Sequence, residues 1–310
     1  MRIKSILPYL ALVGANLFFS GNYMLGGLAM SAMPLMSLMF IKWFTASVPM
    51  LLIAHYVERP EWGLVLKSWR KIFLLGSLGI AGYGFMFYQA LSLTTPLNAS
   101  LINAFNPALI ALASAIFLRE HLSRKAFGGI VLAFCGVTWV LTNGHPGVIF
   151  AHRMNQGDLW MLGVIACWAA YTIIARRGSD VPPLTSVALQ MTLFTLCMAP
   201  YAAINGITLP QTADVAWSMA YIAIFPSAVA FALWNYAARN VSPGVAGQSL
   251  NLTVPFIAIM TLLSGGSISA VDIAGGALIL TGVYITLRAN VVPAAASGPA
   301  VALKSPKVCE

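Results

Sequence analysis

Long apolar runs, separated by short polar or turn-forming segments, occupy almost the whole chain. A helix needs about 20 mainly apolar residues to cross the hydrocarbon core of a membrane. The breaks between the runs carry proline, glycine or basic residues, for example Pro34, Pro96 and the Asn143–Gly144 pair. The pattern predicts an all-α integral membrane protein whose ten transmembrane helices cover 6–28, 34–56, 71–93, 97–118, 125–142, 156–176, 183–203, 213–237, 242–265 and 269–288.

Composition supports this class and narrows the functions that need consideration. Apolar residues make up 59% of the chain and charged residues only 8%, whereas soluble domains carry about 25% charged residues. The net charge of +9 does not indicate nucleic-acid binding, because the basic residues are scattered over short loops instead of forming a patch. The four cysteines stand alone, without the spacing of a metal or redox site, so no cofactor and no metal are expected.

Lysine and arginine alternate between the two sides of the predicted membrane. Fifteen of the 17 fall on the side that holds the N-terminus, only Arg153 falls on the other side, and Lys42 lies inside a span. Basic residues collect in cytoplasmic loops. The distribution therefore predicts that both termini are cytoplasmic, and it supports the number of spans.

The chain also repeats itself at a spacing of about 147 residues. Asn103 then aligns with Asn251, and Pro107 aligns with Pro255. Each copy holds five spans, an odd number, so the second copy enters the membrane inverted relative to the first. The predicted units are a first repeat over 1–142, an external linker over 143–155, a second repeat over 156–290 and a disordered cytoplasmic tail over 291–310. Inverted repeats with a substrate site between them are typical of secondary transporters.

The first copy carries motifs of a known family. Residues 90–122 hold a Thr-Thr-Pro-Leu-Asn-Ala-Ser segment, the pair Asn106–Pro107 and a final Arg-Glu-His-Leu. This segment resembles the EamA domain of the drug/metabolite transporter superfamily, and the resemblance extends over 5–290 as two such domains. The second copy departs from the family pattern, because Gly265–Gly266 stands where a loop acid is usual. Glu120 therefore has no symmetric partner.

The resemblance implies a ten-helix secondary transporter in a bacterial inner membrane that exports amino acids or other metabolites. The spans look most similar to those of amino-acid exporters, including exporters of aromatic amino acids. The partners implied are a small-molecule substrate of the amino-acid class and the lipid bilayer, and a monomer is expected.

Lys42 is the most distinctive candidate for substrate contact. It lies about eight residues into its span, on the order of 12 Å deep at 1.5 Å per residue. A lysine at such depth costs roughly 2.5–3.5 kcal/mol and usually faces a cavity or a partner. It could attract a substrate carboxylate or titrate during transport. Alternatively, it could reach toward water or bond helix carbonyls.

Amide and hydroxyl side chains accompany the two repeat-related prolines. Proline leaves a backbone carbonyl free four residues earlier, which predicts breaks in the helices at Pro107 and Pro255. Side chains near these breaks could bind an ammonium group, or they could join helices by hydrogen bonds. The candidates are Asn103, Asn106, Ser249 and Asn251.

Several aromatic residues fall within spans, whereas interfacial aromatic belts prefer the ends of spans. They could line a cavity suited to aromatic or apolar substrates, although each could equally be a packing residue. The candidates are Tyr83, Tyr88, Trp168, Tyr171 and Trp234, with Tyr236 beside them. Asn16 and Gln89, which are polar and lie within spans, are further candidates. Gly129 and Gly136 on the fifth helix, with Gly275 and Gly282 on the tenth, form a stripe of small residues that predicts close packing between helices.

Other functions remain as alternatives. An enzyme would need paired acids, a nucleophile with its base, or metal ligands, and none occurs at a working spacing within the spans. A scaffold or partner subunit without transport, a channel, and a carrier of other metabolites or drugs stay open. The acids of the predicted spans, Asp158, Asp214 and Asp272, all sit at the starts of their spans, so no carboxylate is embedded at depth. Transport is therefore expected to be facilitated rather than obligatorily coupled to protons. A cavity near Lys42 and the fourth and ninth helices would favour a carrier over a scaffold.

Overall fold

The computed structural model describes residues 3–119, 122–145, 155–176, 181–238, 240–241 and 249–289, which are helical without a strand in these ranges. Eight helical stretches are long and apolar enough to cross a membrane, and a shorter apolar one covers Leu250–Leu263. Helix α1 (Ile3–Ala32) has 30 residues, enough to extend about 45 Å. Together these are the ten expected segments, and the prediction of a helical membrane protein is confirmed.

The helices of the first half are α1, α2 (Leu35–Glu58), α3 (Trp62–Lys67), α4 (Trp69–Gly76), η1 (Ser77–Gly82), α5 (Tyr83–Leu91), α6 (Pro96–Asn103), α7 (Asn106–Phe117) and α8 (Arg124–Leu141). Those of the second half are α9 (Gln156–Arg176), α10 (Pro183–Asn205), α11 (Ala213–Ile224), η3 (Phe225–Val229), α12 (Ala230–Ala238), η4 (Leu250–Leu252), α14 (Thr253–Leu263) and α15 (Ala270–Ala289).

The observed spans end within four residues of the predicted ends, except at the start of the ninth span, which falls on residues outside the described ranges. The short helix α3 was not predicted. Most of the predicted linker 143–155, the predicted tail 291–310 and Glu120 also lie outside the described residues.

Local sequence signals define several of these helix starts. Thr95 and Ser123 each accept a hydrogen bond from the backbone N–H three residues later, which caps α6 and α8. Pro96 occupies the first turn of α6, where its missing N–H costs nothing. Ser269 and Asp272 bond each other's backbone N–H groups and form a capping box before α15.

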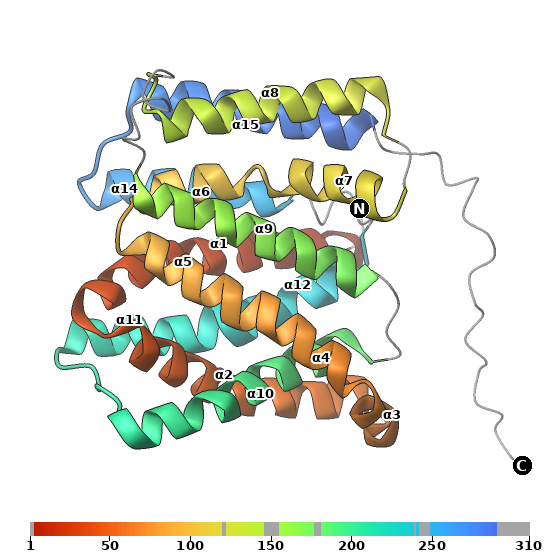
Figure 1. Cartoon of the computed structure of the whole chain (residues 1–310), viewed down its shortest axis with the longest axis vertical. Helices are drawn as coiled ribbons and strands as arrows, with labels where there is room; N and C mark the ends of the chain where they lie inside the picture. The colour runs from red at the N-terminus through yellow and green to blue at the C-terminus, as the bar shows by residue number, and fades with distance from the viewer. Residues whose placement is uncertain are drawn as a thin grey trace, which may run out of the picture.

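The two halves are inverted relative to each other. In Figure 1, α1 starts on the right-hand side, near the end of α15, whereas α9 starts on the left. The repeat-related helices α8 and α15 pack together at one edge of the molecule, and α2 packs on α10 at the opposite edge. Between these two edges, helices of one half pack on helices of the other. Helix α1 packs on α11 and α12, and α9 packs on α4 and α5. Segments from the two repeats therefore surround the centre of the bundle.

The predicted glycine stripe is confirmed at the contact between α8 and α15. A Cβ atom added to Gly129 would lie 2.6 Å from the carbonyl oxygen of Gly282. One added to Gly136 would lie 2.8 Å from the carbonyl oxygen of Gly275. The backbones thus approach too closely for any side chain, as in other membrane helix pairs with small residues at the interface.

Glu58 links the C-terminal end of α2 to the N-terminal end of α10 by hydrogen bonds, a contact that the sequence analysis did not predict. Its carboxylate accepts hydrogen bonds from the backbone N–H of Leu184, at 3.1 Å, and from that of Thr185, at 2.8 Å. The Thr185 hydroxyl donates to the same carboxylate at 2.9 Å. An acid from one half therefore caps the N-terminus of a helix in the other half, where the helix dipole also favours negative charge.

We expect Glu58→Ala to lower the free energy of unfolding by about 1–2 kcal/mol, because the first N–H groups of α10 lose their acceptor. The thermal unfolding midpoint in detergent measures this effect. Glu61→Ala is the matched control, since Glu61 is exposed. Equal midpoints for the two variants would show that the Glu58 cap contributes no stability.

Candidate functional site

A cavity of about 150 Å³ lies between the two halves, and most of its lining residues stand several residues away from either end of their spans. Its walls come from α1, α2, the third, fourth and eighth spans, α9 and the start of the ninth span. The edge helices α8, α10 and α15 contribute none of its described lining residues. Nine of the predicted site residues line the cavity: Lys42, Tyr83, Tyr88, Asn103, Asn106, Pro107, Trp168, Trp234 and Asn251.

The third and eighth spans widen into π-helical segments where they reach the cavity. These segments are η1 and η3, which occupy repeat-related positions. Gly79 and Ile80 of η1 and Pro226 and Ser227 of η3 face the cavity. A π-helical turn changes the direction of side chains within a helix and often marks a functional site. The sequence analysis did not predict either segment.

The fourth and ninth spans are interrupted close to the predicted prolines. Helix α6 ends at Asn103 and α7 begins at Asn106, one residue before Pro107. In the ninth span the 3-10 turn of η4 passes into α14 at Thr253, two residues before Pro255. Pro107 lines the cavity and Pro255 does not.

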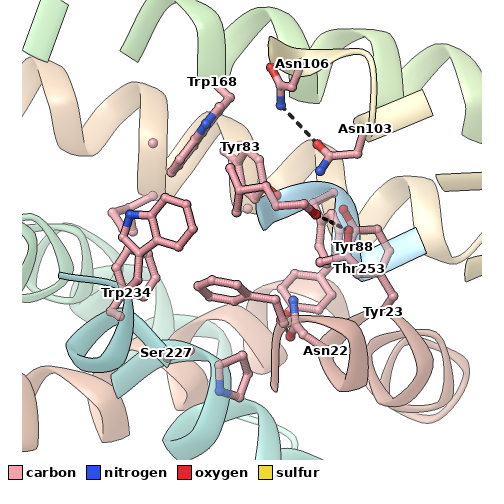
Figure 2. Close-up of a pocket in the computed structure, with 18 of the residues that line it drawn as sticks. Asn22, Tyr23, Tyr83, Tyr88, Asn103, Asn106, Trp168, Ser227, Trp234 and Thr253 are labelled. Atoms are coloured by element: carbon pink, nitrogen blue, oxygen red, sulfur yellow. Dashed lines mark hydrogen bonds between the residues drawn. The ribbon is translucent and has the colours of Figure 1, made fainter. Parts of the chain in front are cut away.

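The interruptions expose amide side chains to the cavity. The Nδ2 of Asn106 donates to the Oδ1 of Asn103 at 3.1 Å, as Figure 2 shows. The Oδ1 of Asn106 is buried and has no hydrogen-bond partner among the described residues. Asn251, the repeat mate of Asn103, lines the same cavity.

Lys42 reaches the cavity from α2 and is only 6% exposed. Its ammonium donates to the Tyr88 hydroxyl at 2.9 Å, and that hydroxyl donates to the Oδ1 of Asn22 at 2.8 Å. The ammonium also lies 4.3 Å from the ring centroid of Trp43 and 5.0 Å from that of Tyr88. Lys42 therefore lines the cavity, and neither of the alternatives considered for it is needed to explain its burial. It is held by a hydroxyl and two aromatic faces, and it has further N–H groups available.

Aromatic rings form much of the remaining wall. The ring centroids of Trp168 and Tyr83 lie 5.4 Å apart. Tyr83 stacks on Phe87 with 5.7 Å between the ring centroids. Trp234 faces the same space from α12 (Figure 2). These rings present flat apolar surfaces that suit an aromatic or apolar group of a ligand.

Five predicted site residues lie outside the lining, as does the further candidate Tyr236; the five are Asn16, Gln89, Tyr171, Ser249 and Pro255. The Nδ2 of Asn16 donates to the carbonyl of Leu12 and to the hydroxyl of Ser249, so these side chains join α1 to the ninth span. Gln89 is absent from the lining, because it follows Tyr88 on the helix and points about 100° away. Tyr171 stacks on Trp168, with 5.1 Å between the ring centroids, and does not itself line the cavity.

The cavity also contains residues that the sequence analysis missed. Asn22 completes the hydrogen-bonded chain from Lys42, and Trp43 supplies an indole N–H that has no partner among the described residues. Tyr23 and Ser227 line the cavity as well. Asn22 and Trp43 each lie close in sequence to a residue that was considered, so side-chain spacing along the helices could have indicated them.

The charge of the cavity is confined to one half of the molecule. Lys42 is its single charged residue within the described lining. Asn103 aligns with Asn251 when the repeats are shifted by 148 residues. The same shift aligns Lys42 with Gln190. Gln190 is 1% exposed and donates to the Ser186 hydroxyl at 2.9 Å, outside the cavity. The cation of the first repeat, Lys42, therefore has no charged counterpart at the equivalent position of the second repeat.

A second, more polar cavity of about 860 Å³ lies at the ends of the spans, on the face opposite the start of α1 and the end of α15. Asp158 and Asp272 line it at the starts of α9 and α15. Asp158 is 2% exposed and accepts a hydrogen bond from Thr94. Both acids stand at helix N-termini, where the helix dipole stabilises them. No group of three potential metal ligands occurs among the described residues.

Among solved structures, the fold is similar to that of a crystal structure whose chain shares 19% sequence identity with this one. The two superpose with a TM-score of 0.62, over 89% of this chain and 97% of that one. The similarity supports the helical architecture described above.

Sequence relatives agree with this architecture. The chain is 26% identical to the uncharacterized transporter YyaM of Bacillus subtilis, over 91% of this chain and 93% of that protein. It is 25% identical to the aromatic amino acid exporter YddG of Ancylobacter novellus, over 70% and 78%. It is 26% identical to a probable terminal-alkyne amino-acid exporter of Streptantibioticus cattleyicolor, over 75% and 76%.

One family model matches both halves of the chain, at residues 6–142 and 155–288. These two matches cover most of the sequence and coincide with the two sets of five spans. The chain therefore belongs to the EamA-like transporter family.

Proposed function

We propose that this protein exports small amphiphilic metabolites that carry a carboxylate, with amino acids as the main class, by alternating access. The observation that carries the proposal is the cavity between the inverted halves, which combines the buried ammonium of Lys42 with a wall of aromatic rings. An ammonium attracts a carboxylate, and the rings accept an apolar or aromatic side chain.

The architecture supports movement of this site between the two faces. Inverted repeats with a ligand site at mid-depth permit one half to rock against the other around that site. Helix interruptions and π-helical segments border the cavity in both halves, so the spans can bend where the ligand is held. A scaffold would have no use for a polar cavity at this depth, since buried polar groups are costly in a membrane.

The comparisons add a substrate class to this proposal. One relative is named an aromatic amino acid exporter, and another is named a probable terminal-alkyne amino-acid exporter. The aromatic wall and the single cation of this cavity suit the same kind of ligand. We place the protein in a bacterial plasma membrane as a monomer. The positive-inside distribution of lysine and arginine favours an orientation with both termini in the cytoplasm.

We further propose that transport is facilitated or an exchange, without an obligatory proton. Proton-coupled carriers use membrane-embedded carboxylates as relays. The described residues that line the central cavity include no Asp or Glu. Asp158, the most buried acid of the described residues, lines the second cavity at the end of its span.

Counterflow tests the function directly. The pure protein is reconstituted into liposomes that contain unlabelled phenylalanine, and labelled phenylalanine is added outside without a pH gradient. We expect transient accumulation of label that protein-free liposomes do not show. Absence of accumulation for phenylalanine and for every other amino acid tested would contradict the substrate class, and strict dependence on a pH gradient would contradict the facilitated mechanism.

A further inference from the structure

We propose that the cavity recognises its ligand as an aromatic monocarboxylate, and that the α-amino group of an amino acid is dispensable for binding. This inference rests on the proposed transport function and narrows its substrate class. Under it, an aromatic acid that lacks the amino group is a substrate at least as good as the corresponding amino acid.

Hydrogen-bond donors are in excess on the α2 side of the cavity. The Lys42 ammonium has three N–H groups, and the structure shows a single side-chain acceptor for them, the Tyr88 hydroxyl. The neighbouring indole N–H of Trp43 is buried and has no partner within the described part of the chain. Buried donors without partners are rare in native structures and indicate a missing acceptor. A carboxylate has two oxygens and satisfies both groups at once.

The acceptors that the described lining offers an ammonium group are all neutral, namely amide oxygens and the hydroxyls of residues such as Tyr23, Ser227 and Thr253. The Oδ1 of Asn22 already accepts from Tyr88, and the Oδ1 of Asn103 already accepts from Asn106. The Oδ1 of Asn106 is buried and, in Figure 2, points away from Tyr83. Asn251 is the remaining amide of the described lining, and it offers a single neutral acceptor.

The charge of the cavity leads to the same conclusion. Lys42 is positive, and no Asp or Glu occurs among the described lining residues. A second ammonium would be repelled by Lys42, and it would lose its hydration without an anionic partner. A monoanion instead neutralises the cavity. Ligand and cavity together then carry no net charge at mid-depth in the membrane, which lowers the cost of moving the occupied site.

Cavity size and the rings define the rest of the ligand. A volume of about 150 Å³ is close to that of an engineered protein cavity that binds benzene. Trp168 and Trp234 stand on the aromatic side of this space, opposite the chain of hydrogen bonds that starts at Lys42 (Figure 2). One aromatic ring with a short carboxylate arm fits between them.

Three probes that share a phenylethyl unit test this inference with the unmodified protein. Phenylalanine carries both charged groups, 3-phenylpropionate only the carboxylate, and phenethylamine only the ammonium. Each is offered as the internal exchange partner for labelled phenylalanine in the counterflow assay, at equal concentration and with neutral pH on both sides.

We expect 3-phenylpropionate to drive exchange at least as well as phenylalanine, and phenethylamine to drive it about tenfold less or not at all, in line with one lost charge-assisted hydrogen bond. If phenylalanine exchanges while 3-phenylpropionate does not, the amino group is required and the inference is overturned, although the transport function stands. If phenethylamine exchanges as well as phenylalanine, the cavity does not require a carboxylate for binding, and the inference is likewise overturned. If none of the three exchanges, the proposed function itself fails.

Discussion

Replacing Gly129 by leucine is expected to remove most folded protein from the membrane. The added Cβ would lie 2.6 Å from the carbonyl oxygen of Gly282 and 2.7 Å from the backbone N of Thr286. Both contacts are with the backbone of α15, which cannot give way as a flexible side chain could. Overpacking costs typically about 1–3 kcal/mol, and a clash with backbone lies at or above the upper end. Fluorescence-detected size-exclusion chromatography measures the yield of monodisperse protein.

Gly128 provides the control on the same helix. A Cβ added there meets nothing within 4 Å, and Gly128 is exposed on the surface that faces lipid. Gly128→Leu should therefore give wild-type yield. If Gly129→Leu matched it, α8 and α15 would not be in the close contact described.

Lys42→Met is expected to produce the largest loss of transport. It removes the single charge of the described cavity lining and keeps a side chain of similar length. A charge-assisted hydrogen bond contributes about 1.5–3 kcal/mol, so counterflow of phenylalanine at a subsaturating concentration should fall about 10- to 100-fold. The fold should persist, because Tyr88 can still donate to Asn22 and because removal of a buried charge is often stabilising.

Gln190→Met is the matched control, since it makes the same substitution at the repeat-related position outside the cavity. Its counterflow should stay close to that of the wild type. Should Lys42→Met leave the counterflow of every tested amino acid unchanged, Lys42 would be a structural residue and the carboxylate site would have to lie elsewhere.

The sequence predicted the spans well, because hydropathy and helix length respond to the membrane itself. It also predicted the repeat and close helix packing at the glycines, since glycine and proline positions reflect backbone requirements that survive between the two copies. That these glycines bring α8 against α15 came from the structure. Interruptions near Pro107 and Pro255 follow from the loss of a backbone donor.

Sequence reasoning could not decide which face of a helix meets the cavity. Asn16 and Asn22 are six residues apart on α1, so their side chains are rotated by about 240°. Asn22 therefore reaches Tyr88, while Asn16 reaches Ser249 on another helix. In an all-apolar span no amphipathic pattern distinguishes these directions.

The π-helical segments were missed for a related reason. Hydropathy is insensitive to which carbonyl a backbone N–H selects, so η1 and η3 look like ordinary helix in the sequence. The clue was Pro226 in the middle of the eighth span, at a position where helix geometry must adjust. Similarly, the Glu58 cap joins residues more than a hundred positions apart, and no local pattern indicates it.

Access to the cavity from both faces tests the central claim most directly. Ser227→Cys, in a background without the native cysteines, places a thiol at the cavity wall with little change in volume. Glu61→Cys and Ser267→Cys, exposed near opposite ends of the spans, report whether a membrane-impermeant thiol reagent acts from the intended side. We predict that the reagent modifies Ser227→Cys from either face, and that phenylalanine slows both reactions. Modification from neither face, while the two reporters react, would contradict a carrier site that opens alternately to the two sides of the membrane.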